Sequence, residues 1–71
     1  MIENSRQFGL VVATARRALG LTQRELALVI NSGERFIVEL EAGKPTAQLG
    51  KALAAAQAVG LRLNASSGPG T

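Results

Sequence analysis

Apolar side chains recur at helical spacing in four segments of the chain, and turn-forming residues separate these segments. In residues 5–19 the apolar positions are spaced by four, three and four residues, which places them on one face of a helix. These positions are Phe8, Val12, Ala15 and Leu19. Gly20 follows, and glycine ends helices readily because it adopts left-handed geometry without steric cost. The pattern predicts a helix that stops just before Gly20.

Two shorter helices are predicted next. Thr22 is followed three residues later by Glu25, the capping-box spacing that begins a helix over residues 23–30. The turn-forming run at residues 31–33 then separates it from a third helix over residues 34–42. Two short helices joined by three or four turn residues have the layout of a helix-turn-helix.

The fourth predicted helix is capped by Thr46 and ends at Gly60. Its apolar stripe consists of Leu49, Leu53, Ala56 and Val59. Residues 61–64 then alternate apolar and polar positions, as a short strand does, and residues 65–71 have the composition of a flexible tail. We therefore expect an all-α fold, in which one domain over residues 1–64 holds four helices and a short C-terminal strand.

The composition leaves little catalytic chemistry. The 71 residues include no Cys and no His, so thiolate metal ligands, cysteine nucleophiles and imidazole bases are all missing. Neither an enzyme nor a bound metal or cofactor is expected. The lack of cysteine fits a reducing cytoplasm. No apolar run approaches the roughly 20 residues of a membrane span, and the N-terminal residues do not follow the pattern of a signal peptide.

Charge and size both indicate partners. Eight Lys and Arg against five acidic residues give a net charge of +3, which suits a polyanionic partner such as nucleic acid. A chain of this length buries only about 60–65% of its unfolded surface, and its only aromatic residues are two Phe. A second copy of the chain would supply the missing apolar contact, so a homodimer is expected.

The third predicted helix has two chemically different faces on a helical wheel of about 100° per residue. Phe36, Ile37 and Leu40 form a core arc, and Glu34, Arg35 and Val38 form an outward arc. In a DNA major groove, Arg can bond guanine, Glu can accept from cytosine, and Val can touch a thymine methyl. The same arc would also suit a solvated face of mixed charge, and the wheel alone does not separate the two interpretations.

Two motifs at a fixed separation resemble the Cro/repressor class (XRE type) of helix-turn-helix regulators. They are Gly20-Leu21-Thr22-Gln23-x-x-Leu26-Ala27 and Ile37-x-x-Leu40-Glu41-x-Gly43-Lys44. The resemblance covers roughly residues 8–60 without a gap. It implies sequence-specific binding of operator DNA, with the second helix of the motif in the major groove. It also implies that Gln23 contacts a phosphate and supports the reading helix, and that Arg16 and Glu41 form a partly buried ion pair.

A longer stretch resembles one branch of that class, the HipB-like antitoxins. The similar segments are Arg35-Phe36-Ile37-x-Glu39-Leu40-Glu41-x-Gly43-Lys44-Pro45-Thr46 and Gly60-Leu61-Arg62-Leu63. In that branch a strand after the fourth helix pairs with its twin across a dimer, and the protein neutralises a HipA-type kinase toxin and represses its own operon. The resemblance thus implies a type II antitoxin whose dimer interface includes Leu61, Arg62 and Leu63. Asn31 and Gly33 depart from the usual turn glycine and the usual Ser or Thr cap.

The wheel and the resemblance together define a candidate DNA-contacting set. It consists of Thr22, Gln23, Gly33, Glu34, Arg35, Val38, Glu39 and Lys44. Two other functions stay open. A stand-alone repressor would have no toxin partner, and a neighbouring kinase-like gene would distinguish the two. An adaptor that kept the fold but lost DNA binding would suit the exposed acid Glu34, and a salt-dependent gel shift would decide.

Overall fold

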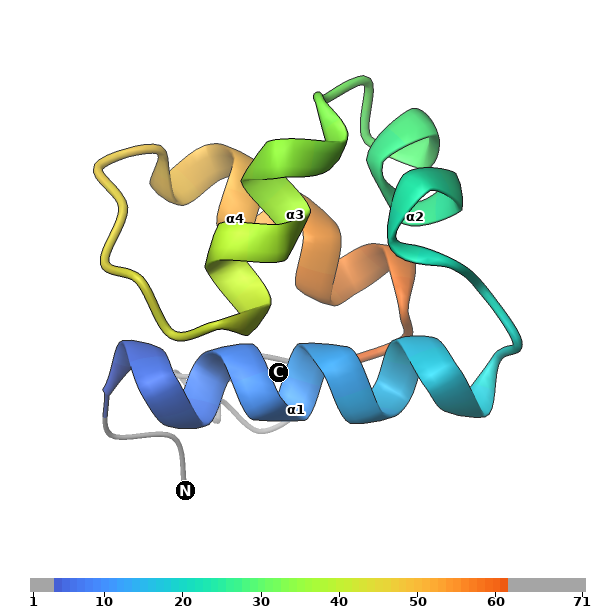
Figure 1. The fold of residues 1–71 in the computed structure, drawn as a ribbon, viewed down its shortest axis with the longest axis horizontal. Helices are drawn as coiled ribbons and strands as arrows, with labels where there is room; N and C mark the ends of the chain where they lie inside the picture. The colour runs from blue at the N-terminus through green and yellow to red at the C-terminus, as the bar shows by residue number, and fades with distance from the viewer. Residues whose placement is uncertain (1–3, 62–71) are drawn as a thin grey trace, which may run out of the picture.

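The computed structural model describes residues 4–61, which form four helices joined by short turns. These helices are α1 (Ser5–Ala18), α2 (Gln23–Val29), α3 (Glu34–Glu41) and α4 (Leu49–Ala58). In Figure 1, α1 runs along one side of the molecule, α3 and α2 lie above it, and α4 lies behind α3. The prediction of an all-α fold is confirmed for the described residues, which contain no strand. The predicted strand over residues 61–64 (apart from Leu61), the domain boundary at residue 64 and the tail lie outside them.

Local sequence signals account for most of the helix ends. The predicted capping box is present: the Thr22 hydroxyl accepts from the Glu25 backbone N–H at 3.0 Å, and the Glu25 carboxylate accepts from the Thr22 N–H at 2.8 Å. Asn31 takes left-handed geometry with φ 57° between α2 and α3, as asparagine tolerates. Residues with positive φ follow the other three helices, and these are Gly20, Gly43 and Gly60.

The core is small and is built from all four helices. Its largest fully buried side chains are Val12 of α1, Leu26 of α2 and Ile37 of α3. The helix α4 contributes mainly small side chains, namely Ala52, Ala55 and Ala56. At Gly9 the backbones of α1 and α3 approach so closely that a Cβ there would clash with the Leu40 carbonyl oxygen and lie 2.9 Å from the Glu41 carbonyl oxygen. Small residues therefore allow close helix packing at both places.

The prediction for α4 was wrong in two respects. The helix begins at Leu49 after Gln48, and Thr46 does not cap it; the Thr46 hydroxyl instead accepts from the Gln48 N–H at 2.9 Å within the preceding loop. Of the predicted apolar stripe, Ala56 and Val59 are buried, but Leu49 and Leu53 are 66% and 46% exposed. The helix packs through its alanines because these let its backbone approach the core. Leu19 at the end of α1 is also exposed.

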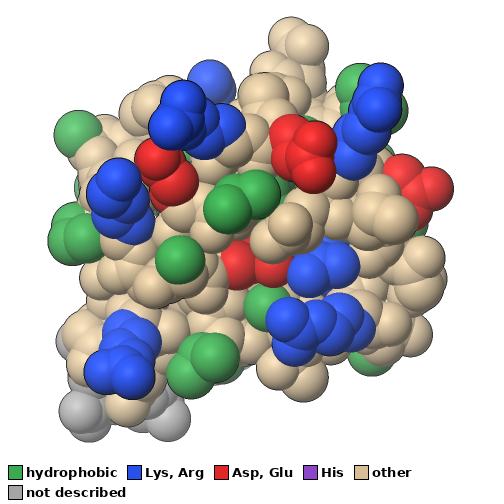
Figure 2. All heavy atoms as spheres, viewed as in Figure 1, with side chains coloured by type: hydrophobic (Ala, Val, Ile, Leu, Met, Phe, Trp, Pro, Cys, Tyr) green, Lys and Arg blue, Asp and Glu red, His purple; other side chains and the backbone are tan. Residues whose placement is uncertain are grey.

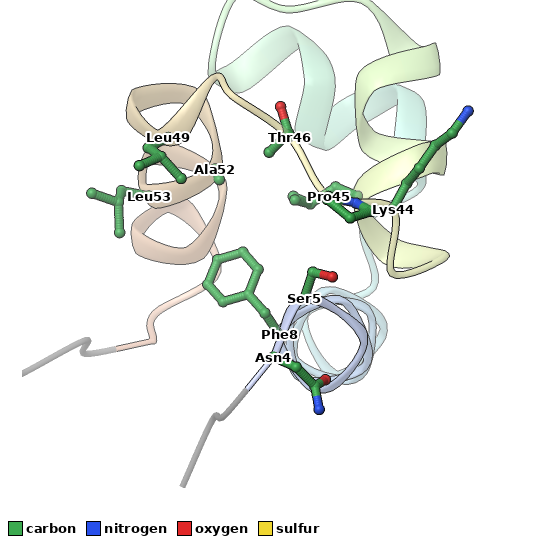
Figure 3. A pocket seen from close by; sticks show the side chains of 10 residues that line it. Asn4, Ser5, Phe8, Lys44, Pro45, Thr46, Leu49, Ala52 and Leu53 are labelled. Carbon is green, nitrogen blue, oxygen red and sulfur yellow. The ribbon is translucent and has the colours of Figure 1, made fainter.

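The two exposed leucines of α4 line a groove of about 380 Å³. Figure 3 shows the Phe8 ring projecting from α1 toward α4, the helix that carries Leu49 and Leu53. Pro45 lies in the loop that connects α3 to α4. Most of the lining is apolar. Within residues 4–61, none of the helices combines the length and the hydropathy needed to cross a membrane.

Candidate nucleic-acid interface

The turn between α2 and α3 sets the relative orientation of the two helices. The Ser32 backbone N–H donates to the Ala27 carbonyl at 2.8 Å, which closes the turn after α2. Gly33 is the N-cap residue of α3 and, having no side chain, gives no capping hydrogen bond. Apart from Gly33 and its own neighbours in the chain, no atom lies within 4 Å of where a Gly33 Cβ would be. The backbone at the start of α3 is therefore open to a partner.

The predicted division of α3 into two faces is confirmed. Ile37 is fully buried and Leu40 is 5% exposed, whereas Glu34 and Arg35 are exposed and Val38 is 43% exposed. Phe36 lies half-buried at the edge of the core. The outward arc of Glu34, Arg35 and Val38 thus stands on a helix whose other side is anchored in the core.

A buried polar network fixes α3 against α1 and α2. Arg16 donates from Nε and Nη2 to the two carboxylate oxygens of Glu41 at 2.7 and 2.9 Å, and from Nη1 to the Leu21 carbonyl at 2.8 Å. Gln23 Nε2 donates to Glu41 at 3.0 Å. The predicted ion pair is confirmed, and both of its side chains are less than 10% exposed.

The electrostatics of this network favour the charged state of Arg16. The hydrogen bond to Glu41 raises the pKa of Arg16 above its usual value, although burial acts in the opposite direction. Bidentate Arg–carboxylate pairs also fix relative orientation, because two parallel bonds allow little rotation. Gln23, at the first position of α2, is tied directly to α3 through the same carboxylate. This contact fits the supporting role that the resemblance implies for Gln23.

A second charged cluster lies on the exposed side of α3. Glu39 Oε2 lies 3.5 Å from Arg35 Nε, one helical turn earlier, and 3.4 Å from Lys44 Nζ, beyond the helix end. Figure 2 shows Lys and Arg side chains spread over the face that carries α3, with acidic side chains between them. This face is therefore basic but interrupted by carboxylates.

The structure brings together most of the predicted DNA-contacting residues. Glu34, Arg35, Val38 and Glu39 share α3, Gly33 precedes it and Lys44 follows it. Thr22 and Gln23 lie at the start of α2. No group of three or more metal-ligating side chains occurs in the part of the chain that the structure describes.

Three contacts of this region were not predicted. Ser5 Oγ donates to the Gly43 carbonyl at 2.9 Å and so ties α1 to the turn after α3. The two residues are 38 positions apart, and no local pattern indicates their contact. The pairing of Glu39 with Arg35 could have been found from their spacing of four residues. The pairing of Glu39 with Lys44 could not have been found from helical spacing, because this pairing depends on how the chain turns at Gly43.

Comparison with known proteins agrees with this geometry. A family model described as helix-turn-helix matches residues 12–65 of the chain. An uncharacterized HTH-type transcriptional regulator, y4mF of Sinorhizobium fredii, is 46% identical over 63 residues, which cover 89% of this chain and 83% of that protein. Both similarities include the two helices of the motif and the turn between them. The chain therefore belongs to the helix-turn-helix family of DNA-binding transcriptional regulators.

Proposed function

We propose that the protein is a homodimeric repressor that reads operator DNA with the outward arc of α3. The observation that carries this proposal is the anchoring of α3. Its inner side is held by buried Ile37 and Leu40 and by the Glu41–Arg16 pair, while Glu34 and Arg35 stand exposed in its first turn. The first turn of the second helix is the part that meets base edges in this motif.

The candidate residues divide into two kinds of contact. Glu34, Arg35 and Val38 offer an acceptor, a bidentate donor and a methyl surface, which are the groups that distinguish bases in the major groove. Glu39 lies at the edge of this arc. The remaining residues of the candidate set supply hydroxyl, amide, backbone N–H and ammonium donors, which suit contacts to phosphate. These are Thr22, Gln23, Gly33 and Lys44.

Substitution of Arg35 and Lys44 tests this division. The probe is the DNA upstream of the chain's own gene, with single-base variants of the bound site, titrated at several salt concentrations. Arg35→Ala should relax the preference at one base pair per half-site, at a cost of about 1–3 kcal/mol. Lys44→Ala should weaken binding evenly across variants and reduce the salt slope by about one unit.

Two results would contradict the proposal. If Arg35→Ala lowers affinity equally for every base variant, Arg35 contacts phosphate and the assignment of the reading arc is wrong. If the wild-type protein binds no DNA, even at low salt, the adaptor function replaces that of a repressor.

The dimer would place two copies of α3 in successive major grooves, about 34 Å apart. We propose that Leu61, Arg62 and Leu63 pair antiparallel with the same residues of a second copy. Leu61 packs partly against the core of its own chain, and its N–H donates to the Ala56 carbonyl at 2.9 Å. This contact fixes the backbone of Leu61, the first residue of the proposed strand, against the end of α4.

We also propose that this repressor is the antitoxin of a type II pair, with a HipA-like kinase as its toxin and its own operon as its target. The support is the resemblance of residues 35–46 and 60–63 to HipB-like antitoxins. The test is co-expression with a HipA-like kinase encoded beside this gene. A stoichiometric complex and restored growth would support the pairing. Absence of such a gene, or growth arrest that the chain does not relieve, would leave a stand-alone repressor.

A further inference from the structure

Glu39 occupies a position on α3 that a simple base-contacting role does not explain. One oxygen, Oε2, pairs with two cations, Arg35 Nε at 3.5 Å and Lys44 Nζ at 3.4 Å. The Glu39 side chain is 41% exposed, whereas Arg35 and Lys44 are 90% and 65% exposed. The carboxylate is thus the less exposed member of both ion pairs, and it links the first turn of α3 to the residue after the helix.

The geometry of the Arg35 contact leaves its recognition group available. The ion pair uses Nε, so the two terminal nitrogens of the guanidinium can still form a bidentate contact with guanine. A side chain held at Nε has fewer conformations to lose when it binds a base. At the same time, a carboxylate beside it repels phosphate and lowers the local charge from +2 to +1.

We propose that Glu39 is a positioning residue that determines specificity: it presents Arg35 to the bases and restrains Arg35 and Lys44 from binding phosphates of any sequence. This inference rests on the proposed function of α3. Without the carboxylate, both cations are free to neutralise phosphates, and each added phosphate contact strengthens binding independently of sequence. Glu39 therefore lowers non-specific affinity more than it lowers affinity for the operator.

The test is Glu39→Gln, measured by fluorescence anisotropy on the DNA upstream of the gene and on a scrambled duplex of equal composition. The variant should bind the scrambled duplex more tightly, and its salt slope there should be steeper by up to about one unit. The ratio of the two affinities should fall roughly five- to tenfold, a part of the discrimination that a good bidentate contact supplies. Circular dichroism should show an unchanged fold, because Glu39 is half-exposed.

A matched control separates this effect from a general change of charge. Glu25→Gln also removes one negative charge, and glutamine preserves the capping box with Thr22. This control should tighten binding to both duplexes in equal proportion and leave their ratio unchanged. In an Arg35→Ala background, Glu39→Gln should lower the ratio less, because the group that Glu39 positions is gone and only the restraint on Lys44 is still lost.

The outcomes are distinct. A ratio that changes no more in Glu39→Gln than in Glu25→Gln would overturn the inference while leaving the repressor function intact. An undiminished fall in the Arg35→Ala background, confined to one base pair, would show that Glu39 contacts a base itself and would also overturn it. Wild-type protein that binds both duplexes equally would overturn the repressor function, and the role of Glu39 with it.

Discussion

Removal of Arg16 should destabilise the fold far more than it weakens the DNA contacts of the folded protein. Arg16→Ala deletes two hydrogen bonds to Glu41 and one to the Leu21 carbonyl. The Glu41 side chain is only 5% exposed and would keep one bond, from Gln23. Loss of one partner from a buried ion pair costs about 3–5 kcal/mol, because a charge is left without compensation.

This loss is large for a protein of this size. At about 0.05–0.15 kcal/mol per residue, a chain of 71 residues has a total stability of roughly 4–11 kcal/mol. A loss of about 3 kcal/mol would lower the melting temperature by at least about 12 °C, given 4–8 °C per kcal/mol for small domains. Urea denaturation followed by circular dichroism measures the change. DNA affinity is measured at a urea concentration well below the unfolding midpoint of the variant. Under that condition the affinity should be reduced only slightly.

The double variant Arg16→Met with Glu41→Leu is the control. Replacing both members of a buried pair by apolar side chains of similar volume is often neutral. The double variant should therefore recover most of the stability that Arg16→Ala loses. If Arg16→Ala unfolds at the wild-type urea concentration and yet no longer binds DNA, Arg16 is a DNA contact and this reasoning is refuted.

Three further substitutions and one truncation test the packing and the assembly. Gly9→Ala should lower the free energy of unfolding by about 1–3 kcal/mol, because its Cβ would lie 2.9 Å from the Glu41 carbonyl oxygen and force α1 away from α3. An unchanged melting temperature would contradict the close crossing of these two helices. Leu26→Ala should lower the free energy of unfolding by about 2–5 kcal/mol. Leu49→Ala, at an exposed site, should lower it by less than about 1 kcal/mol. Equal losses of stability would show that Leu49 is buried in solution. Truncation after Gly60 should weaken the dimer in sedimentation experiments, and an unchanged dimer would refute the proposed strand pairing.

The sequence alone determined the elements whose signals are local. The capping box of Thr22 and Glu25, the left-handed Asn31 and the glycines after α1, α3 and α4 act through backbone geometry within a few residues. Their consequences do not depend on what packs nearby, so the helix-turn-helix could be predicted. The two faces of α3 were equally predictable, because its large apolar and charged residues separate cleanly on a helical wheel.

Tertiary structure decided which face of α4 is buried. The helix is rich in alanine and offers two apolar stripes, one with Leu49 and Leu53 and one with Ala52 and Ala55. Side-chain size favours the leucines as core residues, but the limited space beside the other helices admits only the smaller stripe. Periodicity measures how apolar a face is and carries no information about the shape of the surface it meets.

The charged contacts of the site also divide into those that the sequence indicated and those that only the tertiary structure shows. The likeness to known regulators indicated the pair between Arg16 and Glu41, but only the folded chain shows that Gln23 joins it. Lys44 reaches Glu39 because the turn at Gly43 reverses the chain after α3, a direction that no spacing in the sequence specifies. Long-range polar contacts depend on the positions of whole helices, and those positions are set by the packing of the core.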